Sequence, residues 1–330
     1  MQKLLDSIAI IYQQDADTLE INGWHITRIV GGMNGLVYHA EREIGYPLAV
    51  KICQRDKRNR AGREYAAMQA LDAAGSGVSP KPLYIAPDPP GLPGAAIISE
   101  WLAGKMLEAY PPPQDQASWL AILESLAQVH SLTPEESSLK LSNAATSIRE
   151  PEDMLREINA QFARLPEGKI GQLERNQLEH LVAVATRSTP LRWKQSSPIS
   201  LIHCDSNPNN MIEYDGEIRL VDWENSGWAD PAFDIADICA NPAYGMAFPA
   251  EHHAWIMVEH SRLLHDPTLP ARAAIYTRLI HVWWVLRNGR YLVEANTRLK
   301  GVHQSSRETV LAQQTTLWDR ACSLFQINPT

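Results

Sequence analysis

Four polar residues with a regular spacing lie in two neighbouring stretches of this 330-residue chain. His203, Asp205 and Asn210 belong to LIHCDSNPNNM, and Asp222 follows in LVDWE at the end of the next apolar run. Asp, Asn and Pro are common turn residues, so a plain turn is the alternative interpretation. With ordinary residue frequencies, a His-x-Asp-x4-Asn pattern arises by chance in a chain of this length on the order of one per cent of the time. The spacing therefore favours a functional site.

These residue types suit a magnesium site next to a proton acceptor. Mg²⁺ prefers oxygen ligands, usually one or two carboxylates together with phosphates, and Asn210 and Asp222 would supply an amide oxygen and a carboxylate. Asp205 then stays free to accept the proton of a substrate hydroxyl. We interpret His203 as a scaffold residue that hydrogen-bonds the backbone near the loop, with a free catalytic histidine as the alternative.

An upstream glycine-rich loop is suited to phosphate binding. Residues 31–35 read GGMNG and join two strand-like runs. Glycine-rich loops let backbone amides approach phosphates closely, although a hairpin turn is the simpler explanation. The candidate nucleotide residues in this loop are Gly31, Gly32, Asn34 and Gly35.

A lysine and a glutamate further along the chain form a second candidate phosphate site. Lys51 lies at the end of the apolar run LAVKI, and Glu64 follows near the start of the next helical pattern. Such a lysine can reach the α- and β-phosphates of a nucleotide when a helix carboxylate positions it. A strand-end lysine with its amine in water, and a surface glutamate, are the alternatives.

The elements that must hold these residues divide into two lobes. Residues 24–30, 35–41, 46–52, 81–86 and 95–102 are rich in β-branched and aromatic residues and predict strands. Residues 62–75 predict one helix that stops at Gly75. The first hundred residues therefore predict a small, mostly antiparallel lobe with one helix.

The second lobe is predicted to be mainly helical. Apolar spacing predicts helices over 118–132, 151–165 and 170–187 and again from Pro231 onward. A β-like island at 199–224 interrupts them, with a hairpin between MIEY and IRLVD. Asp230, Pro231 and Asp234 are explained by helix capping and the helix dipole. We predict an α+β fold with lobes 1–103 and 104–330.

Composition excludes several classes of protein. The net charge of −8 argues against a nucleic-acid binder, which would carry a basic surplus. The four cysteines lie far apart, so neither a zinc ribbon nor a disulfide framework is indicated. No secretory signal and no apolar run of roughly 18 residues is present, so neither export nor a membrane partner is expected. We expect a cytoplasmic protein, with its oligomeric state open.

The motifs, in their order, resemble those of the aminoglycoside phosphotransferase family, which shares the protein-kinase-like fold with choline kinases. IHCDSNPNN and LVDWE resemble its catalytic and metal-binding motifs, and GGMNGLVYHAE and LAVKI resemble its nucleotide loop and lysine strand. ISEWLAG, LAQVHSL and WADPAFDIAD resemble its linker, its first large-lobe helix and the segment after its metal aspartate. Cys204 stands where the family usually has glycine.

The resemblance implies a role for each matching position. Asp205 resembles the catalytic base, and Asn210 and Asp222 resemble the Mg²⁺ ligands. Lys51 resembles the phosphate-binding lysine, with Glu64 as its ion-pair partner. The linker residues whose backbone would hold adenine are Glu100, Trp101 and Leu102. ATP and Mg²⁺ are therefore the implied cofactors.

Other enzyme classes fit the sequence less well. A protein kinase would have an Arg at position 204, a Phe at position 223 and a long activation segment, whereas a helical pattern begins within ten residues of Asp222. A serine hydrolase would need a Gly-x-Ser-x-Gly elbow, which the chain lacks. An inactive nucleotide-binding module would be expected to lose the base, the lysine or a metal ligand, and none is lost here.

The acceptor is predicted to be a small, cationic molecule with a hydroxyl group. Residues 201–260 contain eleven acidic residues and one basic residue, Arg219. The acids that can make a cation-attracting cleft include Glu224, Asp230, Asp237 and Glu251. One of two adjacent tryptophans, Trp283 or Trp284, can offer a π face to a cation while the other packs in the core. Choline, ethanolamine, thiamine and neutral acceptors remain alternatives, as does a solvated acidic face.

Overall fold

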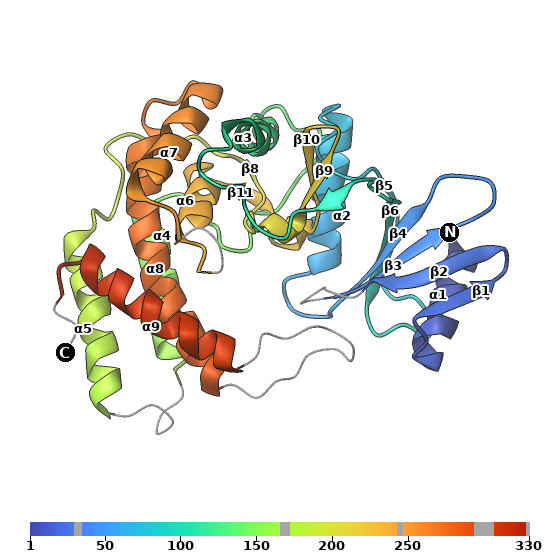
Figure 1. Ribbon diagram of the computed structural model, residues 1–330, viewed down its shortest axis with the longest axis horizontal. Helices are drawn as coiled ribbons and strands as arrows, with labels where there is room; N and C mark the ends of the chain where they lie inside the picture. Colours follow the sequence, from blue (N-terminus) through green and yellow to red (C-terminus); the bar gives the residue numbers. More distant parts are fainter. Residues whose placement is uncertain (30–34, 166–171, 243–246, 294–306, 328–330) are drawn as a thin grey trace.

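The small lobe is built on one antiparallel sheet (Figure 1). The computed structural model describes residues 1–29, 35–165, 172–242, 247–293 and 307–327. Within them the sheet has the order β1-β2-β3-β4-β6-β5, and every neighbouring pair is antiparallel. Its strands are β1 (Thr18–Ile21), β2 (Trp24–Ile29), β3 (Gly35–Glu41), β4 (Leu48–Cys53), β5 (Pro82–Ala86) and β6 (Ala95–Glu100).

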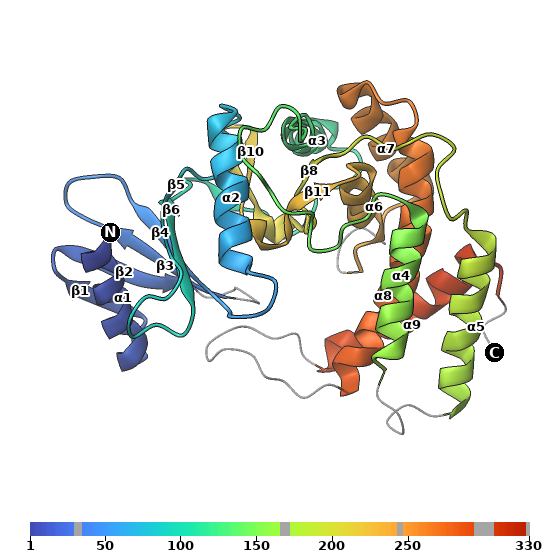
Figure 2. The same ribbon diagram turned by 180° about the vertical axis from the view of Figure 1, so that it is seen from behind.

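A helix covers each face of this sheet. The helix α1 (Gln2–Gln14) packs on the face that carries Val50 and Ile52, on the side away from the large lobe (Figures 1 and 2). The helix α2 (Arg60–Ala73) lies between the sheet and the large lobe. Because successive side chains of a strand point to opposite faces, Lys51 points toward α2. The described small lobe therefore has two helices, and the prediction of one helix missed α1.

The position of α1 follows from its apolar residues. Leu4, Leu5, Ile8 and Ile11 recur at helical spacing and are almost completely buried. A strip of this kind gains stability only when it is packed against another apolar surface, which here is the outer face of the sheet.

The large lobe is mainly helical, as predicted. Its helices are α3 (Gln116–His130), α4 (Pro151–Ala163), α5 (Gln172–Ser188), α6 (Ala232–Ala240), α7 (Ala250–Leu264), α8 (Leu269–Val293) and α9 (Arg307–Leu324). None of the helices in the described part of the chain is long and apolar enough to cross a membrane.

Short strands form the surface of the large lobe nearest the small lobe. The predicted hairpin is confirmed as β9 (Met211–Tyr214) and β10 (Glu217–Leu220), and β7 (Lys105–Met106) extends it. The strand β8 (Ser200–Ile202) pairs with β11 (Gly227–Ala229). Two short 3-10 helices, η1 (Pro208–Asn210) and η2 (Trp223–Asn225), follow β8 and β10. The predicted α+β, two-lobed fold class is confirmed.

Two apolar cores hold the described residues together. One lies between α1 and the sheet, and the other fills the large lobe. The apolar side chains of α2, such as Met68 and Leu71, belong to the large-lobe core. The small lobe therefore shares one of its helices with the packing of the large lobe, which fixes Glu64 relative to Asp222.

Candidate active site

The loop after β8 holds its shape through a buried aspartate on α6. Cys204 has φ of 64°, a left-handed backbone conformation that costs an L-residue roughly 1–2 kcal/mol. Asp234 accepts the N–H groups of His203 and Cys204 at 2.7 and 2.8 Å, and these bonds stabilise that conformation. The positive φ explains why glycine suits this position. Asp234 is therefore structural, as predicted.

Two histidines from other helices support this aspartate. The ring of His130, at the end of α3, lies 3.1 Å from Asp234 and 2.8 Å from His260 on α7. All three side chains are buried. Burial and the neighbouring His130 hold the pKa of His260 well below its usual value. These contacts make the loop a rigid part of the large lobe.

His203 is a scaffold residue, as predicted. Its Nε2 lies 2.9 Å from the carbonyl oxygen of Val221, and its ring centroid is 4.6 Å from that of Trp223. The residue is fully buried, and burial lowers its pKa. It therefore ties the loop that follows β8 to the segment that follows β10.

The backbone brings Asn210 next to the segment of Asp222. The Val221 N–H donates to the Asn210 carbonyl at 2.9 Å, and the Asn210 side-chain amide donates to the Asp205 carbonyl at 2.9 Å. The side-chain oxygen of Asn210 is thereby left on the opposite side of its amide group. Three residues chosen from the sequence, Asp205, Asn210 and Asp222, thus lie on adjoining segments.

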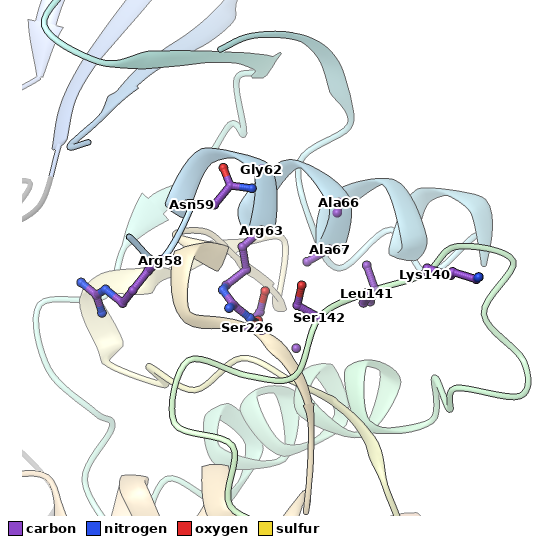
Figure 3. A pocket seen from close by; sticks show the side chains of 11 residues that line it. Arg58, Asn59, Gly62, Arg63, Ala66, Ala67, Lys140, Leu141, Ser142 and Ser226 are labelled. Atoms are coloured by element: carbon purple, nitrogen blue, oxygen red, sulfur yellow. Dashed lines mark hydrogen bonds between the residues drawn. The ribbon is translucent and has the colours of Figure 1, made fainter. Parts of the chain in front are cut away.

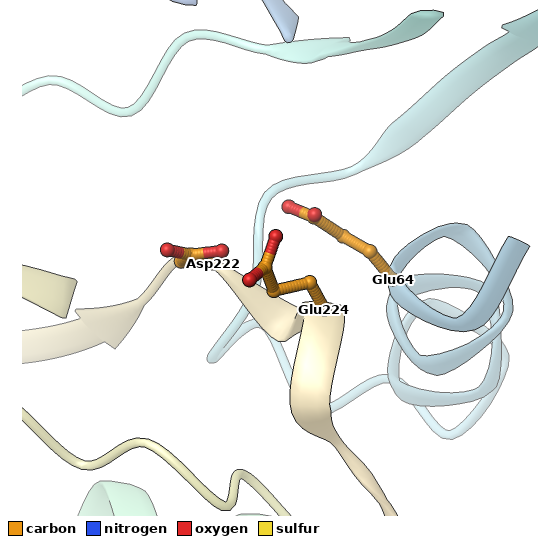
Figure 4. Close-up of side chains that lie close together, drawn as sticks. All are labelled: Glu64, Asp222 and Glu224. Carbon is orange, nitrogen blue, oxygen red and sulfur yellow. The ribbon is translucent and has the colours of Figure 1, made fainter. Parts of the chain in front are cut away.

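A set of charged side chains from both lobes, which we call the lysine cluster, surrounds Lys51. Its Nζ lies 2.6 Å from Glu64 Oε2 and 2.5 Å from Asp222 Oδ1. Glu224 Oε2 is 4.0 Å away. Arg60, from the start of α2, completes the cluster by pairing with Glu224. Figure 4 shows the three carboxylates converging, Glu64 from α2 and the other two from the segment after β10.

Electrostatics within the lysine cluster keep its lysine charged. Burial disfavours the ammonium, but Asp222 and Glu64 outweigh that effect and raise the pKa of Lys51. Burial also disfavours the Asp222 carboxylate, but Lys51 outweighs it and holds the pKa of Asp222 below its usual value. Burial raises the pKa of Glu64. Lys51 and Asp222 therefore form an ion pair between the lobes.

The structure places Glu224 differently from the sequence-based expectation. We expected it to face a cationic acceptor, but its side chain is fully buried and paired with Arg60. The reason is its position on η2, which packs against α2. Its Oε2 is buried and has no hydrogen-bond partner among the described residues. Glu224 therefore belongs to the lysine cluster.

Oxygen donors gather at this point in a way that suits a hard cation. One oxygen from each of Glu64, Asp222 and Glu224 lies within 4.8 Å of the others, and this is the one such group that the described residues contain. Mg²⁺ prefers carboxylate, amide and phosphate oxygens. The orphaned oxygen of Glu224 and the partly exposed Asp222 carboxylate fit that preference.

Asp205 lies beside two asparagines, and we call these three residues the amide cluster. The Asn207 amide donates to Asp205 Oδ1, and the Asn241 amide donates to Asn207 Oδ1 at 2.6 Å. Burial and the negative charge of Asp222 raise the pKa of Asp205 to about 7, although the bond from Asn207 opposes the shift. The cluster comes entirely from the large lobe.

A second carboxylate adjoins the amide cluster. The carboxylate of Asp237, on α6, accepts a hydrogen bond from the backbone of Ser206, and the residue is partly exposed. Burial and the charges of Asp205 and Asp234 raise its pKa well above the usual value. Among the acids proposed for a cation-attracting cleft, Asp237 therefore lies near Asp205 and is partly exposed. Asp230, by contrast, is buried in an ion pair with Arg272.

The remaining predicted residues lie around the sheet, in the linker and on α8. Gly35 begins β3, and a Cβ there would lie 2.8 Å from the Ile52 carbonyl oxygen, so the close approach of β3 to β4 requires glycine. Glu100 ends β6, and Trp101 and Leu102 follow it. The Trp101 N–H donates to the Pro47 carbonyl at 3.1 Å. Gly31, Gly32 and Asn34 lie outside the described residues.

The two tryptophans on α8 contact each other. The ring centroids of Trp283 and Trp284 are 5.0 Å apart at 85°, and both residues are partly buried against the large-lobe core. The described side-chain hydrogen bonds of the amide cluster join Asp205, Asn207 and Asn241 and involve neither ring. The structure does not bring this pair together with the amide cluster.

Sequence reasoning missed Arg60, Asn207 and Asn241. Asn207 lies inside the quoted motif, so its position two residues after Asp205 was an available signal. Asn241 follows α6, and Arg60 begins α2, and neither position has a sequence pattern that points to the site. Their roles depend on contacts over long sequence separations: Asn241 bonds Asn207 over 34 positions, and Arg60 pairs with Glu224 over 164 positions.

A cavity of about 190 Å³ lies against α2, apart from these two clusters. It is lined by Arg58, Arg63 and Lys140, but Figure 3 shows Arg58 and Lys140 directed to opposite ends of it. Arg63 donates to the carbonyls of Asn143 and Ser226. Arg63, the central cation of the cavity, thus connects α2 to the large lobe. We therefore interpret the cavity as part of the contact between α2 and the large lobe.

Comparisons with known proteins identify the family of the chain and proteins that share its fold. The model of the phosphotransferase enzyme family matches residues 25–263. No curated protein matches the chain significantly. Among solved structures, a candidate aminoglycoside phosphotransferase from Ralstonia eutropha JMP134 has 15% identity and a TM-score of 0.68, covering 97% of each chain.

Two further solved structures share the fold. A choline/ethanolamine kinase family protein from Mesorhizobium loti has 19% identity and a TM-score of 0.59, covering 99% of this chain and 96% of that one. A mutant of aminoglycoside phosphotransferase APH(4)-Ia, in a ternary complex with ADP and hygromycin B, has 12% identity and a TM-score of 0.59, covering 97% and 98%.

Proposed function

Since this chain belongs to the phosphotransferase enzyme family and is a small-molecule kinase, we propose that it transfers the γ-phosphate of ATP to a hydroxyl of a small, cationic molecule. The observation that carries the proposal is the meeting of Lys51 and Asp222 across the two lobes, next to the loop that holds Asp205. The parts of a phosphoryl-transfer site are thus on adjoining segments.

The lysine cluster is the proposed phosphate site. Lys51 would bind the α- and β-phosphates, and Glu64 would hold its ammonium in place. The proposed Mg²⁺ ligands are Asn210 and Asp222, and the ion would neutralise charge on the phosphates. The linker of Glu100, Trp101 and Leu102 would hold adenine through backbone groups other than the N–H groups of Glu100 and Trp101, which donate to the carbonyls of Lys81 and Pro47. Gly35 and the loop before it would cover the phosphates.

Asp205 is the proposed proton acceptor. The acceptor oxygen would attack the γ-phosphorus, the bond to the β-phosphate oxygen would break to release ADP, and the hydroxyl proton would pass to Asp205. Burial and Asp222 raise its pKa to about 7, which makes it a better base than an exposed aspartate. A phosphoryl acceptor in contact with Asp205 would also lie next to Asp237.

The proposed cationic character of the acceptor depends on Asp237. Its carboxylate is partly exposed and close enough to Asp205 for each to raise the other's negative potential. A substrate cation would relieve that repulsion. We extend the proposal to a cytoplasmic location, which four free cysteines support.

The test is a screen of acceptors by coupled ADP release with Mg·ATP. Aminoglycosides, choline, ethanolamine and thiamine represent cationic acceptors, and a macrolide sugar and simple sugars represent neutral ones. Acceptor-dependent ADP release is expected only with a hydroxylated cation. Turnover of a neutral acceptor alone would overturn the cationic part. ADP formation that needs no divalent metal would overturn the site assignment.

A further inference from the structure

A chain of amide hydrogen bonds leads from the end of α6 to Asp205. Asn241, the residue that follows α6, donates its side-chain amide to Asn207 Oδ1 at 2.6 Å. The Asn207 amide in turn donates to Asp205 Oδ1. Asn241 is buried, and its bond to Asn207 joins the end of α6 to the loop after β8, whereas the bond from Asn207 to Asp205 lies within that loop.

The order of donors and acceptors in this chain is set by the carboxylate. A carboxylate only accepts hydrogen bonds, so the NH₂ group of Asn207 must face Asp205, and its oxygen must face away. That oxygen lies in a partly buried site and accepts a hydrogen bond from the buried Asn241 side chain. If the donor were lost, the Asn207 amide could rotate and place its oxygen against the carboxylate.

Other groups around Asp205 do not orient its carboxylate in the way that the Asn207 amide does. Asp222 and Asp237 are acids that repel it, and Lys51 pairs with Asp222. The side-chain amide of Asn210 donates to the backbone carbonyl of Asp205 and not to its carboxylate. The side-chain bond from Asn207 is therefore the described contact that fixes how the carboxylate is turned.

We propose that Asn207 and Asn241 are positioning residues that turn the Asp205 carboxylate so that Oδ1 is held and Oδ2 meets the acceptor hydroxyl. This inference rests on the proposed function, because it assumes that Asp205 accepts the proton. Asn241 acts on Asp205 through Asn207, to which it donates the 2.6 Å hydrogen bond. Once Asn207 has been substituted, a further substitution of Asn241 should therefore not lower the turnover rate any more.

A double-mutant cycle separates this role from a general effect on folding. The variants are Asn207→Leu, Asn241→Leu and the double variant, with Asn159→Leu as control. Leucine has nearly the shape of asparagine but forms no hydrogen bond. The control removes an asparagine whose amide bonds only the Leu155 carbonyl within α4. The measurements are kcat with the best acceptor, KM for ATP, and the midpoint of thermal unfolding.

Both single variants are expected to lower kcat by about tenfold or more, since a charge-assisted hydrogen bond orients the base. KM for ATP should stay within about twofold, and the double variant should be no slower than Asn207→Leu alone. If the two losses multiply, or if kcat is unchanged, the proposal fails. If a variant unfolds, Asn241→Asp serves instead: it keeps the shape, draws the Asn207 NH₂ toward itself and should also lower kcat.

Failure of the proposed function would look different. The unmodified enzyme would then show no acceptor-dependent ADP release in any arm of the screen. An active unmodified enzyme with unaffected asparagine variants would overturn only the positioning role.

Discussion

The lysine cluster and the amide cluster adjoin each other but balance charge in opposite ways. In the lysine cluster, Lys51 and Arg60 face Glu64, Asp222 and Glu224, and ion pairs join the lobes. In the amide cluster, Asp205 is held by neutral asparagines, and the carboxylates of Asp222 and Asp237 add negative charge around it. One half is compensated by fixed cations, and the other keeps an excess of negative charge.

This difference separates what each half can bind. Buried ion pairs keep their geometry but resist loss of one partner, since an unpaired buried charge costs about 3–5 kcal/mol. The lysine cluster can accept phosphates and a metal ion by exchanging partners within that network. The amide cluster lacks a cation of its own among the described residues, so a hydroxyl and a positive charge on the acceptor suit it.

The largest effect is expected from Asp205→Asn. The substitution keeps the shape and the contact region with Asn207 but removes the proton acceptor, so kcat should fall by about 10² to 10⁴-fold. Initial rates of ADP release with the best acceptor measure this. ATP affinity and the thermal unfolding midpoint should be close to those of the unmodified enzyme. Near-normal turnover would mean that the amide cluster does not hold the base.

Loss of the Asp222 carboxylate should have the next largest effect, a weaker affinity of the lysine cluster for Mg²⁺. Changes in residues that only support a metal ligand cost about 10–100-fold in metal affinity, so Asp222→Ala should cost at least the upper end of that range. Asn210→Ala should cost less because no full charge is removed. The readout is the Mg²⁺ concentration for half-maximal rate.

Asp215→Asn is the matched control for this experiment. Asp215 lies exposed in the turn between β9 and β10, near Asp222 in sequence but outside the cluster. It should leave the Mg²⁺ requirement unchanged. An equal shift in Asp215→Asn and Asp222→Ala would show that general charge, and not ligation, determines the requirement.

Lys51→Met tests the coupling of the two lobes. Lys51→Met should lower kcat by about 10²–10³-fold, the usual cost of removing one electrostatic contact to a transition state. Glu64→Gln should lower kcat less, because Glu64 acts through Lys51. Both variants should also lower the thermal unfolding midpoint, since a buried partner is lost. Lys57→Met, at an exposed site before α2, should change neither quantity.

The smallest expected effect concerns recognition of the acceptor. Asp237→Asn should raise KM for a cationic acceptor by about 2- to 30-fold, the range for a contact of about 0.5–2 kcal/mol. Higher salt should raise the KM of the unmodified enzyme for a cationic acceptor, and it should raise the KM of Asp237→Asn by a smaller factor. Trp283→Leu and Trp284→Leu test whether either ring adds a π contact.

Glu251→Gln controls for general surface charge in this last experiment, because Glu251 lies exposed in the first turn of α7. Equal changes in Asp237→Asn and Glu251→Gln would place the acceptor away from the amide cluster. No response of KM to salt or to any of these variants would remove the argument for a cationic acceptor.

Local pattern in the sequence determined the positions of the main site residues. The residues from His203 to Asn210 lie in one loop, whose spacing is fixed by the chain itself. The alternation of LAVKI determines that Lys51 faces away from Val50 and Ile52, because strand side chains alternate between faces. The hairpin and the two lobes were likewise predictable from periodicity and turn residues, and capping predicted that Asp234 is structural but not that it accepts the N–H groups of His203 and Cys204.

Tertiary packing decided the rest. Glu224 was read as facing the acceptor, yet it is paired with Arg60, which lies 164 positions away. Asn241 reaches Asn207, the partner of Asp205, because the end of α6 lies beside the loop after β8. Two tryptophans adjacent in sequence gave no indication of which surface each would meet. Which charges are neutralised and which amides meet depends on distances between elements, and a linear pattern of residue types carries no such distances.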